Sequence, residues 1–183
     1  MKTTVVDTIG GLPVSLSDAR YQVGLADSDK DHDVALRSML KAAIESAEGH
    51  TRMRVQHQRV LFTFDAFPDQ LPIYPVREIE SIVYDTDDAD DVSLDLGSVY
   101  LDLAGMYPKL CPVDEWPDLK SGKPGSVRIT AEVGAEAVPE DFKAAVLLRT
   151  KEQFAMRGES VIGAAVSPSQ LTFEALLHRY VRY

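Results

Sequence analysis

The densest group of side chains that could do chemistry is a run of aspartates between residues 85 and 95. Six carboxylates crowd this stretch: Asp85, Asp87, Asp88, Asp90, Asp91 and Asp95. Clustered carboxylates are what Ca²⁺ requires, and the twelve-residue Ca²⁺ loop has Gly at its sixth position and Glu at its twelfth. Counted from Asp85, those positions hold Asp90 and Leu96. The pattern therefore favours a solvated hairpin turn, with a channel lining, a partner contact or a structural metal as the alternatives.

A second chemical pattern is Ser38-Met39-Leu40-Lys41, which matches the S-x-x-K of enzymes in which a lysine activates a serine nucleophile. The companion motifs S-D-N and K-T-G are absent from the chain. Ser38 and Lys41 also fall on the polar side of an amphipathic segment. We therefore interpret the match as chance.

The histidines do not form a metal-binding or catalytic pattern. His32, His50, His57 and His178 make neither H-x-x-x-H nor H-E-x-x-H, and Cys111 is the only thiol. A zinc site normally needs three or four such ligands. No histidine lies between His57 and His178 to serve as a base beside the aspartates. The histidine pattern therefore argues against a zinc site, and we expect no catalytic constellation and no cofactor.

Composition and charge narrow the class of protein further. The chain has 183 residues, of which 45% are hydrophobic and 26% charged, as expected for one soluble domain with or without an insertion. Its formal net charge of −10 argues against tight binding to nucleic-acid phosphates, which depends on Lys and Arg. A single cysteine excludes an internal disulfide and fits a reducing cytoplasm. We expect no membrane span and no secretory signal.

The most clearly bounded element is a helix expected over Val138 to Gly158. Pro139 suits its first position, acidic residues follow, and Arg157 with Gly158 suits its end. Its apolar residues fall on two sides. Phe142, Ala145, Val146 and Met156 share one side, and Ala144, Leu147, Leu148, Phe154 and Ala155 spread over the other. A helix that is apolar on two sides should be covered by two layers, so one layer is its own domain and the other is an insert or a neighbouring copy.

Three further helices are expected. The first begins at the N-cap Ser15 and runs to about Val23. The second is amphipathic over Val34 to Glu48, ends at Gly49, and has an apolar stripe of Leu36, Met39, Leu40, Ala43, Ile44 and Ala47. The last follows the N-cap Ser167 and runs to the C-terminal region, with Phe173, Leu176, Leu177 and Tyr180 on one face.

The middle of the chain predicts strands instead. Apolar and polar residues alternate over 60–65 and 127–133, and residues 79–84 form a β-branched and aromatic run. Prolines and glycines separate these segments. We expect an α+β fold in which a small core of about four helices holds an inserted antiparallel β-rich subdomain between the second and third helices. The expected divisions are 1–51, with residues 1–14 as a flexible lead-in before two helices; 52–135, the β-rich insert; and 136–183, the long helix, a loop and the C-terminal helix.

A family resemblance follows from the order and spacing of several short motifs. The chain carries L-S-D-A-R, E-S-A-E-G-H-T-R, L-P-I-Y-P-V-R-E-I-E-S-I-V-Y-D, K-P-G-S-V-R-I-T-A-E-V-G, V-P-E-D-F-K-A-A-V-L-L and T-F-E-A-L-L-H-R-Y, in this order. Together they resemble the head-tail connector, or portal adaptor, family of tailed phages, prophages and gene transfer agents, in the form that carries a β insertion. The resemblance covers residues 12–180. The Asp-rich loop at 85–95 departs from the family pattern.

The resemblance implies a structural role without catalysis. Members of this family form a ring of about a dozen copies under the portal protein, a cyclic homo-oligomer that extends the DNA channel. Their lower face meets the next neck protein, which is a stopper or tail-completion protein. The expected location is the neck of a virion assembled in the host cytoplasm, with DNA passing through and no membrane contact. Acidic walls would let the duplex slide, because Lys and Arg would bind each passing phosphate.

Three groups of candidate contact residues follow. The portal-binding candidates at the basic, aromatic C-terminus are Arg179, Tyr180, Arg182 and Tyr183, although these arginines could instead complement a helix dipole. The candidates for contact between subunits are Lys143, Leu147, Leu148, Phe154 and Arg157, and Lys143, Thr150 and Arg157 form a polar lane along that helix. The candidates for a channel or partner loop are Asp85, Asp87, Asp88, Asp90 and Asp91.

Two other functions remain open at this point. One is a β-rich binding module for carbohydrate or protein, which would need an exposed aromatic platform. Trp116, the only tryptophan, is expected to be a partly buried anchor of the insert instead. The other is a small metal-dependent hydrolase that uses the Asp85–Asp95 loop.

Overall fold

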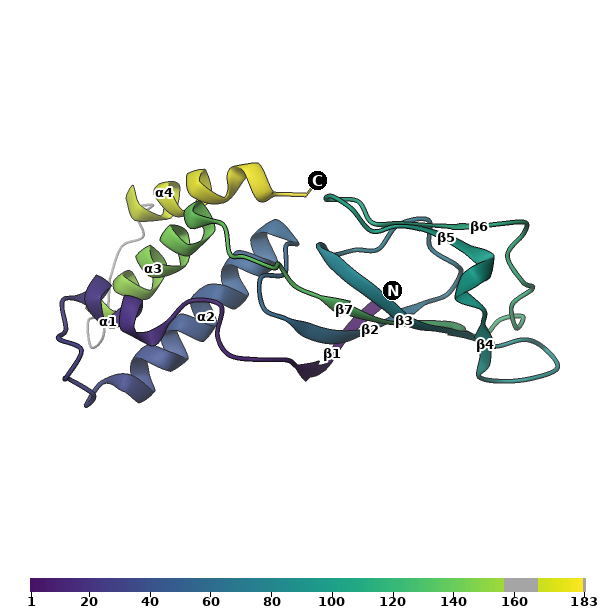
Figure 1. Cartoon of the computed structure of the whole chain (residues 1–183), viewed down its shortest axis with the longest axis horizontal. Helices are drawn as coiled ribbons and strands as arrows, with labels where there is room; N and C mark the ends of the chain where they lie inside the picture. The colour runs from purple at the N-terminus through teal and green to yellow at the C-terminus, as the bar shows by residue number, and fades with distance from the viewer. Residues whose placement is uncertain (157–167, 183) are drawn as a thin grey trace. The chain divides into compact units, whose positions relative to one another are not determined.

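The computed structural model describes residues 1–156 and 168–182, which belong to two compact units. The β unit contains residues 1–11 and 56–135, and the helical unit contains residues 12–55 and the described residues from 136 onward. In chain order, antiparallel strands follow the second and precede the third of the four α-helices in the described residues. The expected α+β class, with a β-rich region between these two helices in the sequence, is therefore confirmed. Figure 1 labels the strands, which belong to the β unit, and the α-helices, which belong to the helical unit.

A five-stranded antiparallel sheet forms the β unit. Its order is β1 (Lys2–Thr8), β2 (Gln58–Phe64), β7 (Val127–Val133), β3 (Val76–Tyr84) and β4 (Val92–Leu94). The central strand β7 alternates buried and half-buried residues along its whole length, and so does β2. Their register places Phe62 opposite Ile129, so the two strands bury the same face. The alternation predicted for both strands is therefore confirmed.

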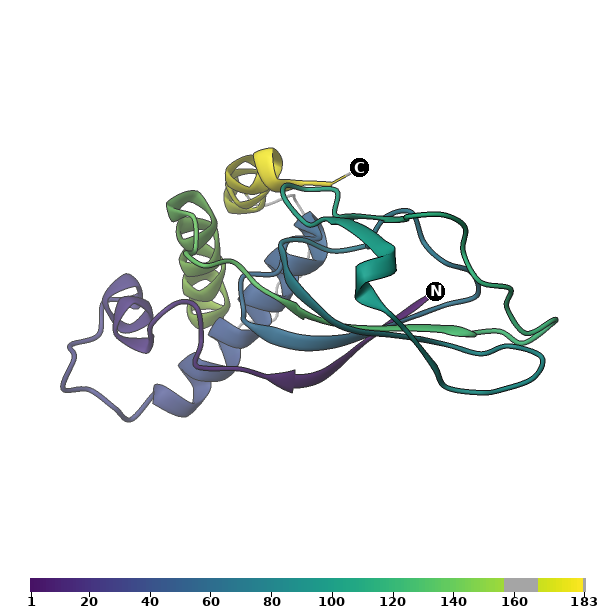
Figure 2. The same cartoon turned by 45° about the vertical axis from the view of Figure 1, so that its right-hand side comes forward.

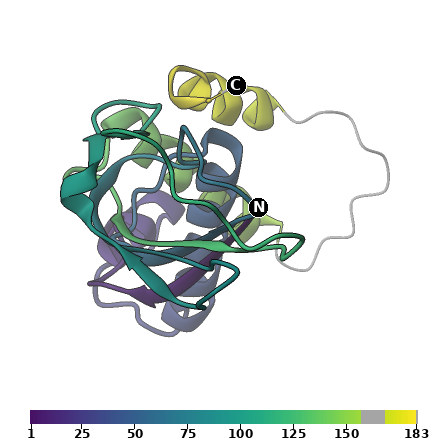
Figure 3. The same cartoon turned by 90° about the vertical axis from the view of Figure 1, so that its right-hand side faces the viewer.

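A two-stranded hairpin covers the buried face of the sheet. It consists of β5 (Val99–Asp102) and β6 (Lys109–Pro112), preceded by the 3₁₀ turn Leu96–Ser98. Val99 and Leu110 from the hairpin join the core residues of the sheet. Figures 2 and 3 show the hairpin lying over one face of the sheet. Trp116 is half-buried and stacks on Phe67 with ring centroids 4.4 Å apart, which confirms it as an anchor of this unit.

The N-terminal lead-in prediction is wrong for residues 2–8. These residues form strand β1, which pairs with β2 from Lys2↔Thr63 to Thr8↔Gln58. All seven residues of β1 are exposed, so no side chain of the strand is buried and the sequence has no in-out alternation. Pairing with the open edge of β2 supplies the backbone hydrogen bonds that hold the strand in place.

Gly134 allows a close approach of two backbone segments after β7. Its φ is +128°, and a Cβ there would lie 2.6 Å from the carbonyl oxygen of Gln56. Only glycine adopts this conformation without strain and leaves room for the neighbouring backbone. The Arg77 side chain then donates from Nε to the Gly134 carbonyl, at 2.7 Å. The chain can therefore leave the sheet directly after its central strand.

The helical unit begins with two helices, α1 (Leu16–Val23) and α2 (Asp33–Thr51). Ser15 is the N-cap of α1, as predicted, and its hydroxyl accepts from the Asp18 N–H at 3.0 Å. The predicted end of α2 at Gly49 is wrong. The helix continues to Thr51, because packing of buried Ala47, Glu48 and Thr51 outweighs the low helix propensity of one glycine.

Glu48, an acidic residue in the last turns of α2, is buried. Its carboxylate accepts from the Val55 N–H at 2.8 Å and pairs with Arg54 at 3.4 Å. The carboxylate therefore fixes the backbone that follows the helix. Arg52, in the left-handed conformation with φ of 63°, ends α2 through its N–H to the Glu48 carbonyl.

Helix α3 (Glu140–Ala155) lies among the other helices of its unit. It contacts α1, α2 and α4 (Pro168–Leu177), and Figure 1 shows it between α4 and α2. Phe142, Ala145 and Val146 are fully buried. Met156 was expected on that same side but lies beyond the helix end and is 50% exposed. The expected closing residues Arg157 and Gly158, and the N-cap Ser167, lie outside the described residues.

No helix in the part of the chain that the structure describes has both the length and the apolar character that a bilayer crossing demands.

Replacing Phe142 by alanine should selectively destabilise the helical unit. The ring is fully buried on α3 and meets the Tyr180 ring edge-on, with centroids 6.3 Å apart. We expect a loss of about 3–5 kcal/mol in the free energy of unfolding, which is typical of Phe→Ala in a core. Far-UV circular dichroism should follow the helices during denaturation, and Trp116 fluorescence should follow the β unit.

The exposed Met156 provides the matched control for that measurement. A Met156→Ala variant should differ from the parent chain by less than about 0.5 kcal/mol. Equal losses for the two variants would contradict the packing of α3 described here.

Candidate functional site

The acidic loop after β3 is a network of ion pairs centred on Asp85. The Asp85 carboxylate is fully buried and accepts from both Nη atoms of Arg128, with Nη1 2.9 Å from Oδ2. Lys123 Nζ lies 2.7 Å from Oδ2, and the Asp91 N–H donates to Oδ1 at 2.9 Å. The expectation of a solvated loop is therefore wrong for Asp85, because its charge is compensated inside the protein.

The sheet register positions this network. Tyr84, the last residue of β3, pairs with Val127, the first residue of β7. The next residue, Asp85, continues the pairing through its N–H to the Ser126 carbonyl, at 3.0 Å. Asp85 therefore lies close to the Arg128 side chain, which projects from β7. The backbone pairing of β3 with β7 therefore places the acid and the arginine next to each other.

The other aspartates of the loop are exposed, as predicted, and most have partners. Asp90 pairs with Lys120 at 3.0 Å and with Lys123 at 3.1 Å. Asp87 accepts from the Ser121 N–H at 3.1 Å, and Asp91 pairs with Arg128 at 2.7 Å. Asp88 is exposed. The loop is thus tied to the segment 120–128, so its outer carboxylates sit on an ordered turn.

Neighbouring cations lower the pKa of two carboxylates of the loop, those of Asp85 and Asp90. Hydrogen bonds from Arg128, the Asp91 N–H and Lys123 hold the pKa of Asp85 well below its usual range, although burial acts in the opposite direction. Lys120 and Lys123 likewise lower the pKa of Asp90. Within residues 1–156 and 168–182, no three His, Cys, Asp or Glu side chains are placed to hold a metal ion. The geometry suits structural pairing of charges rather than proton transfer.

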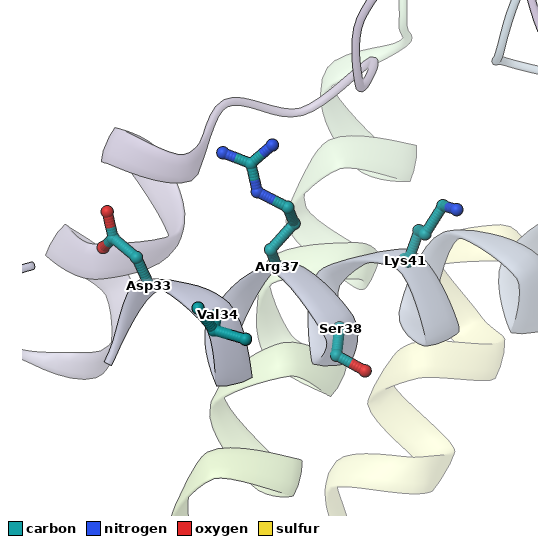
Figure 4. A pocket seen from close by; sticks show the side chains of 5 residues that line it. All are labelled: Asp33, Val34, Arg37, Ser38 and Lys41. Carbon is teal, nitrogen blue, oxygen red and sulfur yellow. The ribbon is translucent and has the colours of Figure 1, made fainter. Parts of the chain in front are cut away.

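Ser38 and Lys41 of the S-x-x-K motif help to line an open pocket along α2. The other lining residues are Asp33, Val34 and Arg37. Figure 4 shows the Ser38 hydroxyl and the Lys41 amine pointing away from each other. A lysine that activates a serine must reach its hydroxyl within hydrogen-bonding distance. This arrangement supports the interpretation of the motif as chance.

The C-terminal candidates pack against their own helical unit. Arg179 pairs with Asp141 at 3.1 Å but remains 70% exposed. Tyr180 is half-buried against Phe142, and the Arg182 N–H donates to the Thr51 carbonyl at 3.2 Å. Tyr183 lies outside the described residues. Of these four candidates, Arg179 has the side chain most available to a partner among those described.

The α3 candidates differ in how available they are. Leu147, Leu148 and Phe154 are half-buried within the helical unit, and the Phe154 ring meets His32 edge-on at 5.7 Å. Lys143 pairs with the exposed Glu140 at 3.1 Å. Arg157 lies outside the described residues.

Thr150 does not belong to the predicted polar lane. It is fully buried, and its hydroxyl donates to the Val146 carbonyl at 2.8 Å. A buried hydroxyl that bonds back to its own helix satisfies itself without a partner. The expectation that it faces an adjacent subunit is therefore wrong.

The division of charge between the two units was not predicted. The β unit contains 16 acidic and 7 basic residues, a formal charge of −9, whereas residues 12–55 and 136–183 together contain 13 acidic and 12 basic residues, a formal charge of −1. Almost the whole negative charge of the chain therefore belongs to the β unit. The signal was available in the sequence, since the fourteen carboxylates between residues 65 and 118 outnumber the bases there.

Comparisons with solved structures show that gene transfer agent particles contain chains of this fold. A chain in the virion of a native gene transfer agent particle is 22% identical, with a TM-score of 0.81 over 100% of this chain and 96% of that one. Chains from the neck of an empty particle, computed with C6 symmetry, and from the neck of a native particle, computed with C12 symmetry, give a TM-score of 0.76 over the same shares. Their identities are 22% and 23%.

The other two comparisons found no relative. No family model matches the chain, and no curated protein is significantly similar to it. At 22–23% identity, the structural matches establish the fold, which extends over the whole chain.

Replacing Asp85 by asparagine should destabilise the β unit in a pH-dependent way. A carboxylate whose pKa is lowered by folding stabilises the protein above its unfolded pKa of about 4, and this contribution decreases as the pH falls below that value. The stability difference between parent and variant should therefore be largest near neutral pH and should shrink below about pH 4. Urea titrations followed by Trp116 fluorescence at several pH values measure it.

Asp88→Asn is the control, because it removes an exposed carboxylate of the same loop. Its stability should match that of the parent at neutral pH. If Asp85→Asn proved equally harmless there, Asp85 would not be the centre of the network.

Proposed function

We propose that this chain is a structural head-tail connector in the neck of a tailed phage or phage-like particle. The observation that carries the proposal is the match of the entire fold to chains from gene transfer agent particles, two of them from the neck. The order of sequence motifs supports the same class independently. In this role the protein joins the head to the next neck or tail-completion protein and catalyses no reaction.

A ring of copies under the portal is the assembly that this role requires. The neck structures that contain the similar chains were computed with C6 and C12 symmetry, which supports a cyclic assembly of many copies. We assign Lys143, Leu147, Leu148, Phe154 and Arg157 as contacts between adjacent copies. Lys143 supports this assignment best, because its partner Glu140 is exposed and can exchange for a carboxylate of the neighbour.

The charge of the β unit suits a passive conduit for DNA. A unit with a formal charge of −9 repels phosphates, whereas each Lys or Arg in contact with DNA adds salt-sensitive affinity. Asp87, Asp88, Asp90 and Asp91 stand on an ordered turn and are exposed, so they are candidates for the channel wall or for a partner contact. In this proposal DNA passes through without specific binding.

Electron microscopy of the purified chain mixed with the portal protein tests the proposed function. We expect class averages with additional ring-shaped density under the portal and no such density for portal alone. Symmetry analysis of the averages then gives the number of copies. A chain that stays separate from the portal at all concentrations, and is missing from purified particles, would contradict the proposal.

The C-terminal region gives a point test of portal binding. Deleting residues 179–183 would also remove the packing of Tyr180 on Phe142, so a substitution at exposed Arg179 is the cleaner change. Arg179→Glu should weaken binding to the portal by about tenfold or more, because arginines are enriched among residues that dominate interfaces. Sedimentation or surface plasmon resonance with purified portal measures the change.

Lys151→Glu is the matched control, since Lys151 is an exposed base of the same unit and the change in charge is identical. It should bind the portal like the parent chain. Equal weakening by both variants would show a general effect of charge and would remove the assignment to Arg179.

A further inference from the structure

The outer side of the β5–β6 hairpin carries exposed apolar and aromatic side chains. Tyr100 is 66% exposed on β5, and Val113 and Tyr107 flank β6 with large exposed areas. Cys111, also exposed, lies directly opposite Tyr100 in the register of the hairpin. We call these four residues, Tyr100, Tyr107, Cys111 and Val113, the hairpin patch.

The strand register explains why Tyr100, Cys111 and Val113 share one side. Side chains of a strand alternate between its two faces, so the core residues Val99 and Leu110 point toward the sheet and their neighbours Tyr100 and Cys111 point away from it. The Val113 N–H donates to the Ser98 carbonyl at 2.9 Å and extends the ladder beyond β6. Val113 is therefore a diagonal neighbour of Tyr100 on the outer face.

The fold of the β unit does not need the hairpin patch. The inward residues Val99 and Leu110 already bury their side chains in the core. Exposed apolar groups cost solvation free energy, and clusters of them mark contact sites more often than scattered single residues do. Tyrosine in particular is enriched where interfaces concentrate their binding energy.

The charges around the hairpin patch define the chemistry of its partner. Residues 99–118 contain four acidic residues and one basic residue, and all five are exposed. They are Asp102, Asp114, Glu115 and Asp118, and Lys109. A second hairpin of the same chain would bring like charges together, and the helical unit is nearly neutral. A complementary surface has an apolar centre and a rim of Lys and Arg.

We propose that the hairpin patch is the docking surface for a different protein of the particle neck, whose contact face has an apolar centre and a basic rim. The class of partner that we infer depends on the proposed neck role. The identification of the surface depends on the exposure, register and charge of the hairpin. Tyr100 is the central anchor of the contact, with Val113 beside it.

Cys111 offers a direct test, because it is the only cysteine of the chain and lies inside the hairpin patch. The rate of its alkylation by a maleimide is measured in the purified chain and in intact particles, followed by mass spectrometry of the chain. We expect fast labelling of the free chain and strongly suppressed labelling in the particle, with labelling restored when the neck is dissociated by denaturant.

The possible outcomes separate this inference from the proposed function. If the chain is present in particles and Cys111 reacts as fast as in the free chain, the docking surface is wrong although the neck role stands. If Cys111 becomes protected in a homo-oligomer of the purified chain alone, the occupant is a second copy and the proposal is overturned. If particles do not contain the chain, both the neck role and the proposed partner are wrong.

A pair of tyrosine variants tests the energetic role of the patch. Tyr100→Ser should leave the unfolding midpoint unchanged and lower the fraction of particles with an attached tail about tenfold, as for loss of an interface anchor. Tyr21→Ser is the matched control, because Tyr21 is 87% exposed on α1 of the helical unit and lies outside the patch. Normal tail attachment by Tyr100→Ser particles, or equal losses for both variants, would overturn the assignment.

Discussion

Burial of two consecutive elements, β7 and α3, is the constraint on which the structure depends. β7 is the central strand of the sheet and pairs with both β2 and β3, and α3 contacts the three other helices of its unit. Only a short connection through Gly134 separates them, so one stretch of sequence supplies the centre of each unit. A substitution that removes apolar surface from β7 should therefore destabilise the β unit, and one that removes it from α3 should destabilise the helical unit.

Charge is organised around the same strand. Arg128 extends from β7 to the buried Asp85, and Lys120 and Lys123 add their charges to the loop, so three of the seven bases of the β unit are used at this one turn. A buried acid must be paired or it would shift the equilibrium toward unfolding. Because these bases are engaged locally, few are left elsewhere in the unit to balance its other carboxylates. The acidic character of the unit itself comes from its composition, 16 acidic against 7 basic residues.

Elements with a regular pattern of burial were predictable from sequence, and elements without one were not. The in-out alternation of β2 and β7 and the stripe of α2 from Leu36 to Ala47 follow directly from side-chain periodicity. β1 has only exposed residues, so its place depends on backbone pairing with β2, although its run of Thr and Val was a usable signal. In the sequence, Asp85 could not be distinguished from the other five aspartates of the loop, because its burial depends on the strand register.

The contact residues illustrate a more general limit of sequence reasoning. Leu147, Leu148 and Phe154 stood out because α3 is apolar on two sides, yet other helices of the unit already half-cover them. The hairpin side chains did not stand out, since alternation in so short a strand does not tell which face the fold will cover. An apolar side chain already covered by its own fold has less surface left for a partner. Exposure of an apolar side chain after folding is therefore a better guide to assembly contacts than hydrophobicity in the sequence. On this basis we expect the hairpin to contribute more binding energy to assembly than helix α3.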